Sequence, residues 1–291
     1  MTLIVGATGT LGGEICRLLT ERKKAVRALV RATSNAEKVA GLKNLGVEIV
    51  QGDLKDRPSL EAACRGVSAV VTTASSTHSR QEGDSIESVD RQGQLDLIDA
   101  AERAGVARFV LISFPESDPD FPLQAAKRAV ENRLRSSRMT YTILQPTFFT
   151  EIWLSPALGF DPANGTAQIY GSGQNKISWI SFQDVARFAV EAIDNPTATN
   201  ATIELGGPDA LSPLEVVRLV EQTLGRTVAV QHVHEDALRA QHSQAADSLQ
   251  QSFAGLMLYY AHGDVIDMTQ TLRALPVGDL RSVRGHFQAH A

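Results

Sequence analysis

The first 146 residues alternate short apolar runs with stretches in which apolar residues recur at helical spacing. Such runs are typical of strands buried on both faces of a parallel sheet, and they cover residues 3–5, 25–30, 47–51, 67–73, 108–113 and 141–146. Helical spacing is found between them, over residues 11–19, 86–104 and 123–136. Strands that alternate with helices predict an α/β fold, a doubly wound parallel sheet of Rossmann type with right-handed crossovers.

The pattern becomes less regular after Pro146, where residues 147–178 are rich in aromatic and turn residues. A helix is predicted over 182–193, a strand over 201–205, a second strand over 227–233 and a helix over 235–261. Ser212 and Glu215 form a capping box that opens another helix. From Arg281 onward no packing pattern is visible, and this tail is expected to be disordered. We expect a sheet domain over 1–150 and a smaller lobe over 151–291, with 178–205 returning to the sheet.

Three glycines follow the first strand with the spacing Gly-x-x-Gly-x-x-Gly and precede an amphipathic helix. Such a strand–turn–helix unit presents backbone N–H groups and a helix N-terminus to a pyrophosphate. Gly6 allows the sharp turn, Gly9 lets the backbone approach the phosphates, and Gly12 lets the helix pack close to the strand. The position of the glycines therefore predicts that residues 1–150 bind a dinucleotide, which Thr8, Thr10 and Leu11 would also contact.

The end of the second strand indicates which dinucleotide is bound. An NAD site has an acidic residue there, about 20 residues after the glycines, to bond the ribose 2′-hydroxyl. This chain instead has Arg31, and no acid occurs before Glu37. A guanidinium can form a charge-assisted fork with a 2′-phosphate, with Ser34 and Lys38 as helpers. We therefore predict NADP(H) rather than NAD(H); the structural alternative is that Arg31 is a solvated loop residue.

Other candidate ligand contacts follow the remaining strands, because ligands of open parallel sheets bind beyond the carboxyl ends of the strands. Asp53 can bond the adenine amine while Leu54 covers the ring, although an aspartate here fits a turn or N-cap equally well. Small residues after the fourth strand can line the middle of the cofactor, and they also suit any tight strand exit. The remaining predicted cofactor contacts are Thr73, Ala74, Ser75, Pro146 and Phe149.

The composition of the chain limits the kinds of partner that it is expected to bind. The 291-residue chain is 43% hydrophobic and 21% charged, which is ordinary for a soluble globular protein. Its net charge of −5 and the lack of a basic stripe argue against nucleic acid. No apolar run is long enough to span a bilayer, and the first residues lack the basic region of a signal peptide. A cytoplasmic protein with a small-molecule substrate is expected, and a homodimer is left open. Cys16 and Cys64 are expected to be small buried hydrophobes.

Further motifs accompany the glycine turn and Arg31. They are Gln51-Gly52-Asp53-Leu54, Lys127-x-x-x-Glu131, Thr140-Tyr141-Thr142-Ile143-Leu144-Gln145-Pro146 and Trp179-Ile180-Ser181-x-x-Asp184-Val185-Ala186. Together they resemble the NmrA-like branch of the atypical short-chain dehydrogenases/reductases, from residue 1 to about residue 230. The resemblance implies a Rossmann fold and NADP(H). The branch includes reductases of quinones, isoflavone-like enones and benzylic ethers, and also members that sense NADP(H) without turnover.

The resemblance also assigns catalytic candidates and shows a departure. Typical short-chain dehydrogenases use Tyr-x-x-x-Lys with an upstream serine; here Ser113 and Lys127 match, but Leu123 stands at the tyrosine position and cannot donate a proton. Gln145 stands where many relatives carry arginine. Either Lys127 binds the nicotinamide ribose and serves as the acid/base itself, or the acceptor takes its proton from water. The structural alternatives are a surface lysine paired with Glu131 and a mere strand-end hydroxyl at Ser113.

Aromatic residues after Pro146 are candidates to enclose a substrate, although they suit the core between two lobes equally well. The predicted substrate contacts are His78, Phe148, Trp153 and Tyr170. Tyr259 and Tyr260 are further candidates to replace the missing acid. His232 and His234 share one face of a strand, but without a third ligand nearby no metal site is predicted.

The sequence thus leaves two functions. The first is an NADPH-dependent oxidoreductase that transfers hydride to a small, apolar, conjugated acceptor such as a quinone or enone. The aromatic second lobe favours this function. The alternative is a non-catalytic NADP(H)-binding redox sensor or regulator, which the missing tyrosine favours.

Overall fold

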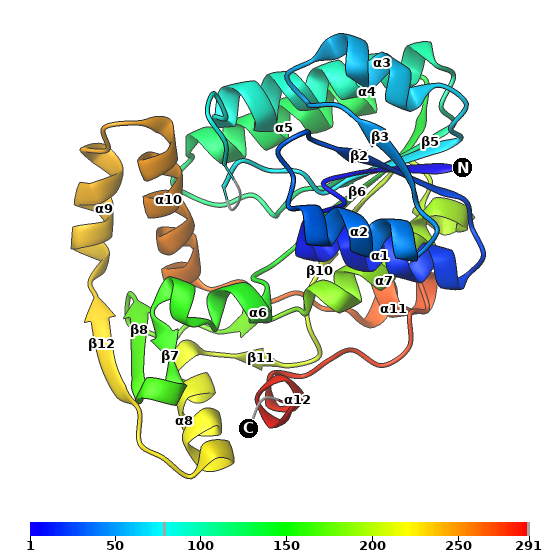
Figure 1. The fold of residues 1–291 in the computed structure, drawn as a ribbon. Coiled ribbons are helices and arrows are strands. Elements are labelled where there is room, and N and C mark those ends of the chain that lie inside the picture. The colour runs from blue at the N-terminus through cyan, green and yellow to red at the C-terminus, as the bar shows by residue number, and fades with distance from the viewer. Residues whose placement is uncertain (78–79, 290–291) are drawn as a thin grey trace.

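The computed structural model describes residues 1–77 and 80–289. A seven-stranded parallel sheet with the order β3-β2-β1-β4-β5-β6-β10 forms its larger part (Figure 1). The strands are β1 (Thr2–Val5), β2 (Val26–Val30), β3 (Glu48–Gln51), β4 (Ala69–Thr72), β5 (Arg108–Ile112), β6 (Thr140–Pro146) and β10 (Ala201–Leu205). The predicted doubly wound α/β fold of Rossmann type is confirmed.

Helices cover both faces of the sheet. Successive side chains of a strand point to opposite faces, so each buried strand contributes apolar side chains to both helical layers. Ile4 of β1 packs in the core on the side of α1 (Thr10–Glu21), α2 (Ala36–Asn44) and α7 (Phe182–Asp194). Leu3 and Val5 point to the other core, on the side of α3 (Arg57–Cys64), α4 (Gln94–Arg103) and α5 (Pro122–Arg135). The two layers are visible above and below the sheet in Figure 1. Cys16 and Cys64 are free thiols, one in each core, as predicted, and burial raises the pKa of both to about 12.

The helix predicted over 86–104 has two parts. Its first half is a π-helix, η1 (Ile86–Gly93), which Ser85 caps, and α4 continues from Gln94. The helix passes very close to the loop after β3, because a Cβ on Gly93 would lie 2.8 Å from the Cβ of Leu54. Hydrophobic spacing does not distinguish a π-turn from an α-turn over so short a segment.

Most of the remaining elements build a smaller part beside the carboxyl ends of the strands, whereas α11 (Thr269–Ala274) and the 3-10 turn at Pro196–Ala198 pack on the larger part beside α7 (Figure 1). A three-stranded sheet has the order β12-β8-β7, and β9 and β11 form a short pair. The strands are β7 (Phe160–Asp161), β8 (Thr166–Tyr170), β9 (Ile177–Ser178), β11 (Ala210–Leu211) and β12 (Ala229–Val233). The helices are α6 (Thr150–Trp153), α8 (Pro213–Leu224), α9 (Glu235–Ser243), α10 (Ser248–His262), α11 (Thr269–Ala274) and α12 (Val283–Gln288), and short 3-10 turns lie at Pro156–Leu158, Pro162–Asn164 and Pro196–Ala198.

Two predictions for this part need correction, and one is confirmed. The helix expected over 235–261 is two helices, because Asp247 caps a new start by accepting bonds from the N–H groups of Leu249 and Gln250. The disorder expected from Arg281 onward is wrong for residues 281–289, because α12 buries Val283 and Phe287. Two apolar residues one turn apart are too few to form a recognisable pattern. The Ser212–Glu215 capping box is confirmed.

Among the helices of residues 1–77 and 80–289, none has the length and hydrophobicity needed to span a membrane.

The close packing of α1 on the glycine turn leads to a stability prediction. A Cβ on Gly12 would lie 2.3 Å from the carbonyl oxygen of Gly6. Gly12→Ala is therefore expected to lower the free energy of unfolding by about 2 kcal/mol, because the helix must move away from the strand. Gly41→Ala in α2 is the control: nothing described lies within 4 Å of its Cβ, so helix propensity should raise stability by up to about 1 kcal/mol. Urea unfolding followed by circular dichroism measures both, and equal stability of the two variants would contradict the packing argument.

Candidate functional site

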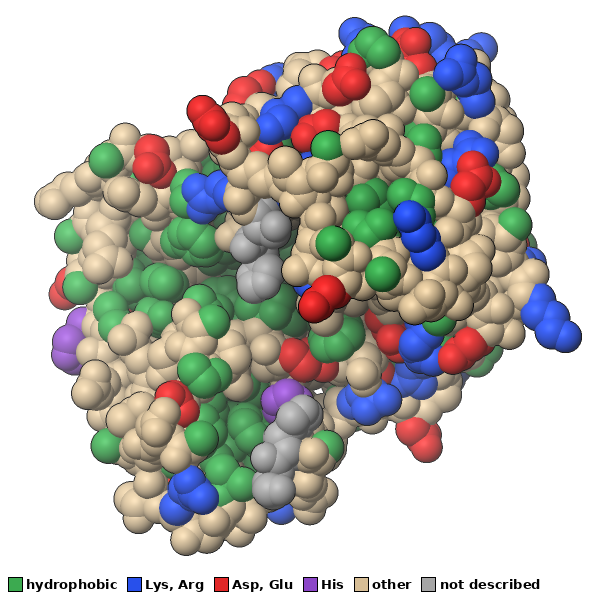
Figure 2. Space-filling view, in the orientation of Figure 1, with side chains coloured by type: hydrophobic (Ala, Val, Ile, Leu, Met, Phe, Trp, Pro, Cys, Tyr) green, Lys and Arg blue, Asp and Glu red, His purple; other side chains and the backbone are tan. Residues whose placement is uncertain are grey.

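A cavity of about 440 Å³ lies where the carboxyl ends of the strands meet the smaller part. Its lining comes from the glycine turn, the ends of β2 to β6, and the helices α5, α6 and α10. Hydrophobic side chains gather in the hollow between the two parts of the molecule (Figure 2). This is the place where open α/β sheets bind their ligands.

The glycine turn forms one wall of the cavity, and Gly6, Thr8, Gly9, Thr10 and Leu11 line it. Gly6 has φ +88°, a conformation that favours glycine, and its carbonyl accepts a bond of 2.9 Å from the Gly9 N–H. Among the described residues no side chain caps the N-terminus of α1, and no acid lies in its first turn. The first N–H groups of the helix are thus available to an anion. Gly12 packs against the turn from the far side, outside the cavity lining.

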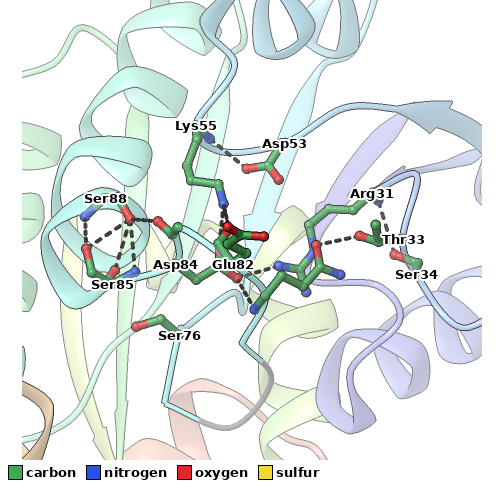
Figure 3. A network of polar contacts seen from close by, with 12 residues as sticks. Arg31, Thr33, Ser34, Asp53, Lys55, Ser76, Glu82, Asp84, Ser85 and Ser88 are labelled. Atoms are coloured by element: carbon green, nitrogen blue, oxygen red, sulfur yellow. Dashed lines mark hydrogen bonds and ion pairs between the residues drawn. The ribbon is translucent and has the colours of Figure 1, made fainter.

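The end of β2 forms a charged corner of the same cavity (Figure 3). Arg31, Ser34 and Lys38 line this corner, as the sequence suggested for a 2′-phosphate site. The Oγ of Ser34 accepts a bond of 3.2 Å from the Arg31 N–H, which fixes the turn. The guanidinium of Arg31 is in turn paired with Asp84, with 2.7 Å between Nη1 and Oδ2. Asp84 is not predictable from the sequence as a partner of Arg31, because it lies 53 residues away in a loop without a regular pattern.

The remaining predicted cofactor contacts lie at the ends of β3, β4 and β6, along the same cavity. Asp53, Leu54, Thr73, Ala74, Ser75, Pro146 and Phe149 all line it. Asp53 also has the turn role that the sequence left open, because its Oδ1 accepts a bond of 2.8 Å from the Lys55 N–H. Thr73 donates through Oγ1 to the carbonyl of Val5 at 3.3 Å.

Strand order sets the length of this site. Arg31 follows β2, whereas Ser113 follows β5, and these strands are separated by β1 and β4. Three strand spacings correspond to about 14 Å, which suits a dinucleotide lying across the strand ends. The corner around Arg31 and the region around Ser113 and Lys127 are therefore opposite ends of one cavity.

Lys127 on α5 lines the cavity and is buried. Its Nζ donates to the carbonyl of Ile112 at 3.3 Å, at the end of β5. Burial lowers the pKa of this amine, the carboxylates of Asp90 and Glu131 oppose that shift, and Arg128 adds to it. The alternative of an exposed lysine is excluded, and Glu131 takes its hydrogen bonds from other side chains.

Ser113 also lines the cavity, but its hydroxyl proton is already engaged. Its Oγ donates to Glu131 Oε1 at 2.6 Å and accepts from Arg128 Nη2 at 3.1 Å. Gln145 donates to the same carboxylate oxygen at 3.0 Å, and Arg135 bonds the other at 3.1 Å. A hydroxyl has one proton to donate, so this network removes Ser113 as a ready proton donor.

Asp90 on the π-helix is a second buried carboxylate beside the lysine. Its Oδ2 accepts bonds from the Ser76 N–H at 3.0 Å and from the Ser76 hydroxyl at 2.6 Å. Its Oδ1 is buried and has no hydrogen-bond partner among the described residues. A buried charge of this kind needs a nearby cation, and the charge of Asp90 acts on Lys127.

Apolar residues enclose the end of the cavity near Lys127. Phe148 and Trp153 line it, with ring centroids 4.9 Å apart, and Ile152 and Leu256 complete this wall. Leu123, at the position of the usual tyrosine, also lines it. These side chains include no acidic group, and their aromatic and aliphatic surfaces suit a flat apolar ligand.

Tyrosines are placed differently from the sequence prediction. Tyr170 is not among the lining residues; it is buried in the aromatic core, where its hydroxyl donates to the Leu158 carbonyl at 3.2 Å. Tyr260 is likewise buried against Trp153. Tyr259 on α10 does line the cavity, and its hydroxyl donates to Asp264. Burial raises the pKa of Asp264.

His78 lies outside the described residues. Of the two histidines expected on one strand face, His232 lies on β12 and contacts the carbonyl of Gly171 through Nδ1 at 2.9 Å. His234 lies beyond the strand, at the N-cap position of α9. Within residues 1–77 and 80–289 there is no group of three or more side chains suited to hold a metal ion.

The sheet order, the glycine turn and the cavity at the strand ends are those of a Rossmann-type α/β protein. The model of the NmrA-like family matches residues 1–275, and the chain belongs to this family. Relatives of the chain include NAD(P)H-dependent reductases.

Two curated relatives and one solved structure illustrate the range of the family. The chain is 35% identical over 230 residues to the NAD(P)H azoreductase of Xenophilus azovorans, covering 78% of this chain and 75% of that protein. It is 32% identical over 242 residues to the photosystem II assembly factor Ycf39 of Synechocystis sp., covering 81% and 72%. The NADPH complex of the Escherichia coli quinone oxidoreductase QOR2 superimposes with a TM-score of 0.76 at 24% identity, covering 100% and 99%, which is a likeness of fold.

Proposed function

We propose that this protein is an NADPH-dependent reductase that transfers hydride to a small, flat, apolar and conjugated acceptor. One observation carries the proposal. A single cavity joins the glycine turn and Arg31 at one end to the buried amine of Lys127 and an aromatic wall at the other. A dinucleotide can thus be held at its phosphates while its reactive ring faces an apolar space.

The residues present fit NADP(H). Gly9 and the uncapped N-terminus of α1 would hold the pyrophosphate, and Arg31 with Lys38 would hold the 2′-phosphate. The bound nicotinamide would supply the hydride. Pro146 and Phe149 would flank that ring at the end of β6, where both line the cavity.

The aromatic wall supports a flat acceptor. Phe148, Trp153 and Leu256 offer ring faces and aliphatic surface, with few polar groups to bond a sugar or a charged acid. The azoreductase relative and the fold likeness to a quinone oxidoreductase support the same class, since azo compounds and quinones are conjugated hydride acceptors. We place quinones, enones and azo compounds in this class.

Lys127 has two tasks in this proposal. Its Nζ can bond the nicotinamide ribose, and it can donate a proton to the acceptor atom that becomes negative when hydride arrives. Burial makes this easier, because it lowers the pKa of the ammonium and so makes it a stronger acid. The amine then regains its proton from water.

A non-catalytic NADP(H) sensor is the second candidate, and two observations favour it. Leu123 cannot donate a proton, and the Ser113 hydroxyl already donates its hydrogen bond to Glu131. The relative named as a photosystem II assembly factor is consistent with a family member whose task is not turnover. NADPH consumption against quinones, enones, imines and azo dyes distinguishes the two: turnover with any acceptor supports the reductase, and NADPH binding without turnover supports the sensor.

The cofactor assignment makes a separate prediction at Arg31. Arg31→Ala is expected to lower NADPH affinity by about tenfold to a hundredfold, because a charge-assisted fork to the 2′-phosphate is lost, and to leave NADH affinity almost unchanged. Parallel fluorescence titrations measure both constants. Arg65→Ala, at an exposed arginine outside the cavity lining, is the control and should change neither. An equal loss of NADPH and NADH affinity in Arg31→Ala would contradict the assignment.

A further inference from the structure

The side chain of Asp84 is unusually buried for its place in a surface loop. It lies between β4 and the π-helix and is 1% exposed, whereas its partners Arg31 and Lys55 are 27% and 28% exposed. Oδ2 bonds Arg31 Nη1 at 2.7 Å and accepts from the Gln81 N–H at 3.0 Å, and Oδ1 bonds Lys55 Nζ at 2.5 Å. Figure 3 shows the carboxylate between the two cations.

This contact joins the loop to the site. Lys55 also donates to the carbonyl of Glu82 at 3.3 Å, and Thr33 bonds the side chain of Gln81. The segment 81–84 is thereby held over the corner where Arg31 and Lys38 line the cavity. Burial alone would raise the pKa of Asp84, but hydrogen bonds from Lys55, Gln81 and Arg31 hold it below its usual range, so Asp84 is an anion at neutral pH.

The charges of this corner have a consequence for cofactor choice. A 2′-phosphate brings negative charge to Arg31, whereas the 2′-hydroxyl of NADH brings none. Without Asp84, NADH binding would leave Arg31 and Lys55 as two adjacent cations with no counter-charge. With Asp84, one positive charge is already balanced, and an incoming phosphate is placed near a carboxylate that repels it.

We propose that Asp84 determines cofactor selectivity by pairing with Arg31 as a 2′-phosphate would, so that the corner accepts NADH as well as NADPH. The inference rests on the proposed function, in which Arg31 holds the 2′-phosphate. Within the described residues Asp84 bonds one guanidinium nitrogen, Nη1, which leaves Nε and Nη2 for a phosphate. NADPH therefore binds beside Asp84, but less tightly than the two cations alone would allow.

Asp84→Asn tests the inference, because it removes the charge and keeps the size and one acceptor oxygen. Titration of the purified protein with NADPH and with NADH is expected to show NADPH affinity raised by about tenfold. NADH affinity should be unchanged or lower, so the ratio of the two constants rises. Glu82→Gln is the matched control: it removes a charge from an exposed side chain of the same segment and should leave the ratio within about twofold. An unchanged or lower ratio in Asp84→Asn would overturn the proposal.

A double variant separates this inference from the cofactor assignment. In an Arg31→Ala background, Asp84→Asn should no longer raise the ratio by its full factor, because the partner through which Asp84 acts is gone. If Arg31→Ala itself leaves the ratio unchanged, the 2′-phosphate assignment fails. If Arg31→Ala changes the ratio and Asp84→Asn does not, the role of Asp84 fails. Asp84→Ser removes the same charge with a smaller side chain and must shift the ratio of NADPH to NADH affinity in the same direction. It replaces Asp84→Asn if that variant does not fold.

Discussion

Lys127→Met is expected to lower kcat for NADPH-dependent reduction by about 100-fold while NADPH affinity changes by only about threefold. Methionine fills the buried space of the lysine stem but can neither donate a proton nor bond the ribose. The loss falls mainly on kcat because proton donation is needed in the transition state. Contacts between the phosphates of NADPH and the glycine turn supply most of the binding free energy of the cofactor, and the substitution leaves them in place. Steady-state kinetics together with NADPH titration measure the two effects separately.

The pH profile shows whether Lys127 acts as an acid. Burial lowers its pKa, so the ammonium is lost at lower pH than the ordinary lysine value of about 10.4. Because the protonated form donates, kcat should fall as pH rises through this lowered pKa, and the fall should be absent from the residual rate of Lys127→Met. If kcat of the parent and kcat of Lys127→Met fall in the same way as pH rises, another group, or the acceptor itself, titrates in that range.

Gly9→Val is expected to weaken NADPH and NADH binding alike, by about 100-fold. A branched side chain at this position keeps the pyrophosphate away from the first N–H groups of α1, and the loss of two charge-assisted bonds corresponds to a factor of this size. A Cβ on Gly9 would lie 3.2 Å from Gly6 O, so the turn has to move by a few tenths of an ångström to accept the valine.

Gly13→Ala, on the same helix, is the control for Gly9→Val. Its added Cβ would make only an ordinary contact of 3.4 Å with the carbonyl of Ala7, so both cofactors should bind as in the parent. Calorimetric titration of the two variants, with thermal unfolding to confirm that both are folded, measures the difference. Normal dinucleotide binding by Gly9→Val would rule out the glycine turn as the phosphate site.

The sequence could predict the sheet and one side of the cavity because both depend on local patterns. Continuous apolar runs specify buried parallel strands, and their strand ends locate Gly9, Arg31 and Asp53 without knowledge of tertiary contacts. Ser212 and Glu215 predicted a helix start for the same reason, since a capping box lies within four residues.

The partners of these residues could not be predicted, because they are distant in sequence. Asp84 pairs with Arg31 from a loop 53 residues away, and Glu131 accepts the hydrogen bond of the Ser113 hydroxyl across 18 residues. No periodic pattern identifies such pairs. The placement of Tyr170 failed for a related reason, since an aromatic residue suits either a core or a pocket wall, and packing against Tyr260 decides which.

A single-turnover experiment with the parent protein tests the proposed reductase function. Protein saturated with NADPH is mixed rapidly with a naphthoquinone, and the loss of NADPH absorbance is followed beside the same mixture made with Lys127→Met. We expect complete oxidation of the bound NADPH by the parent and a rate about 100-fold lower in the variant. Tightly bound NADPH that no quinone, enone or azo acceptor oxidises would contradict the reductase and support an NADP(H) sensor.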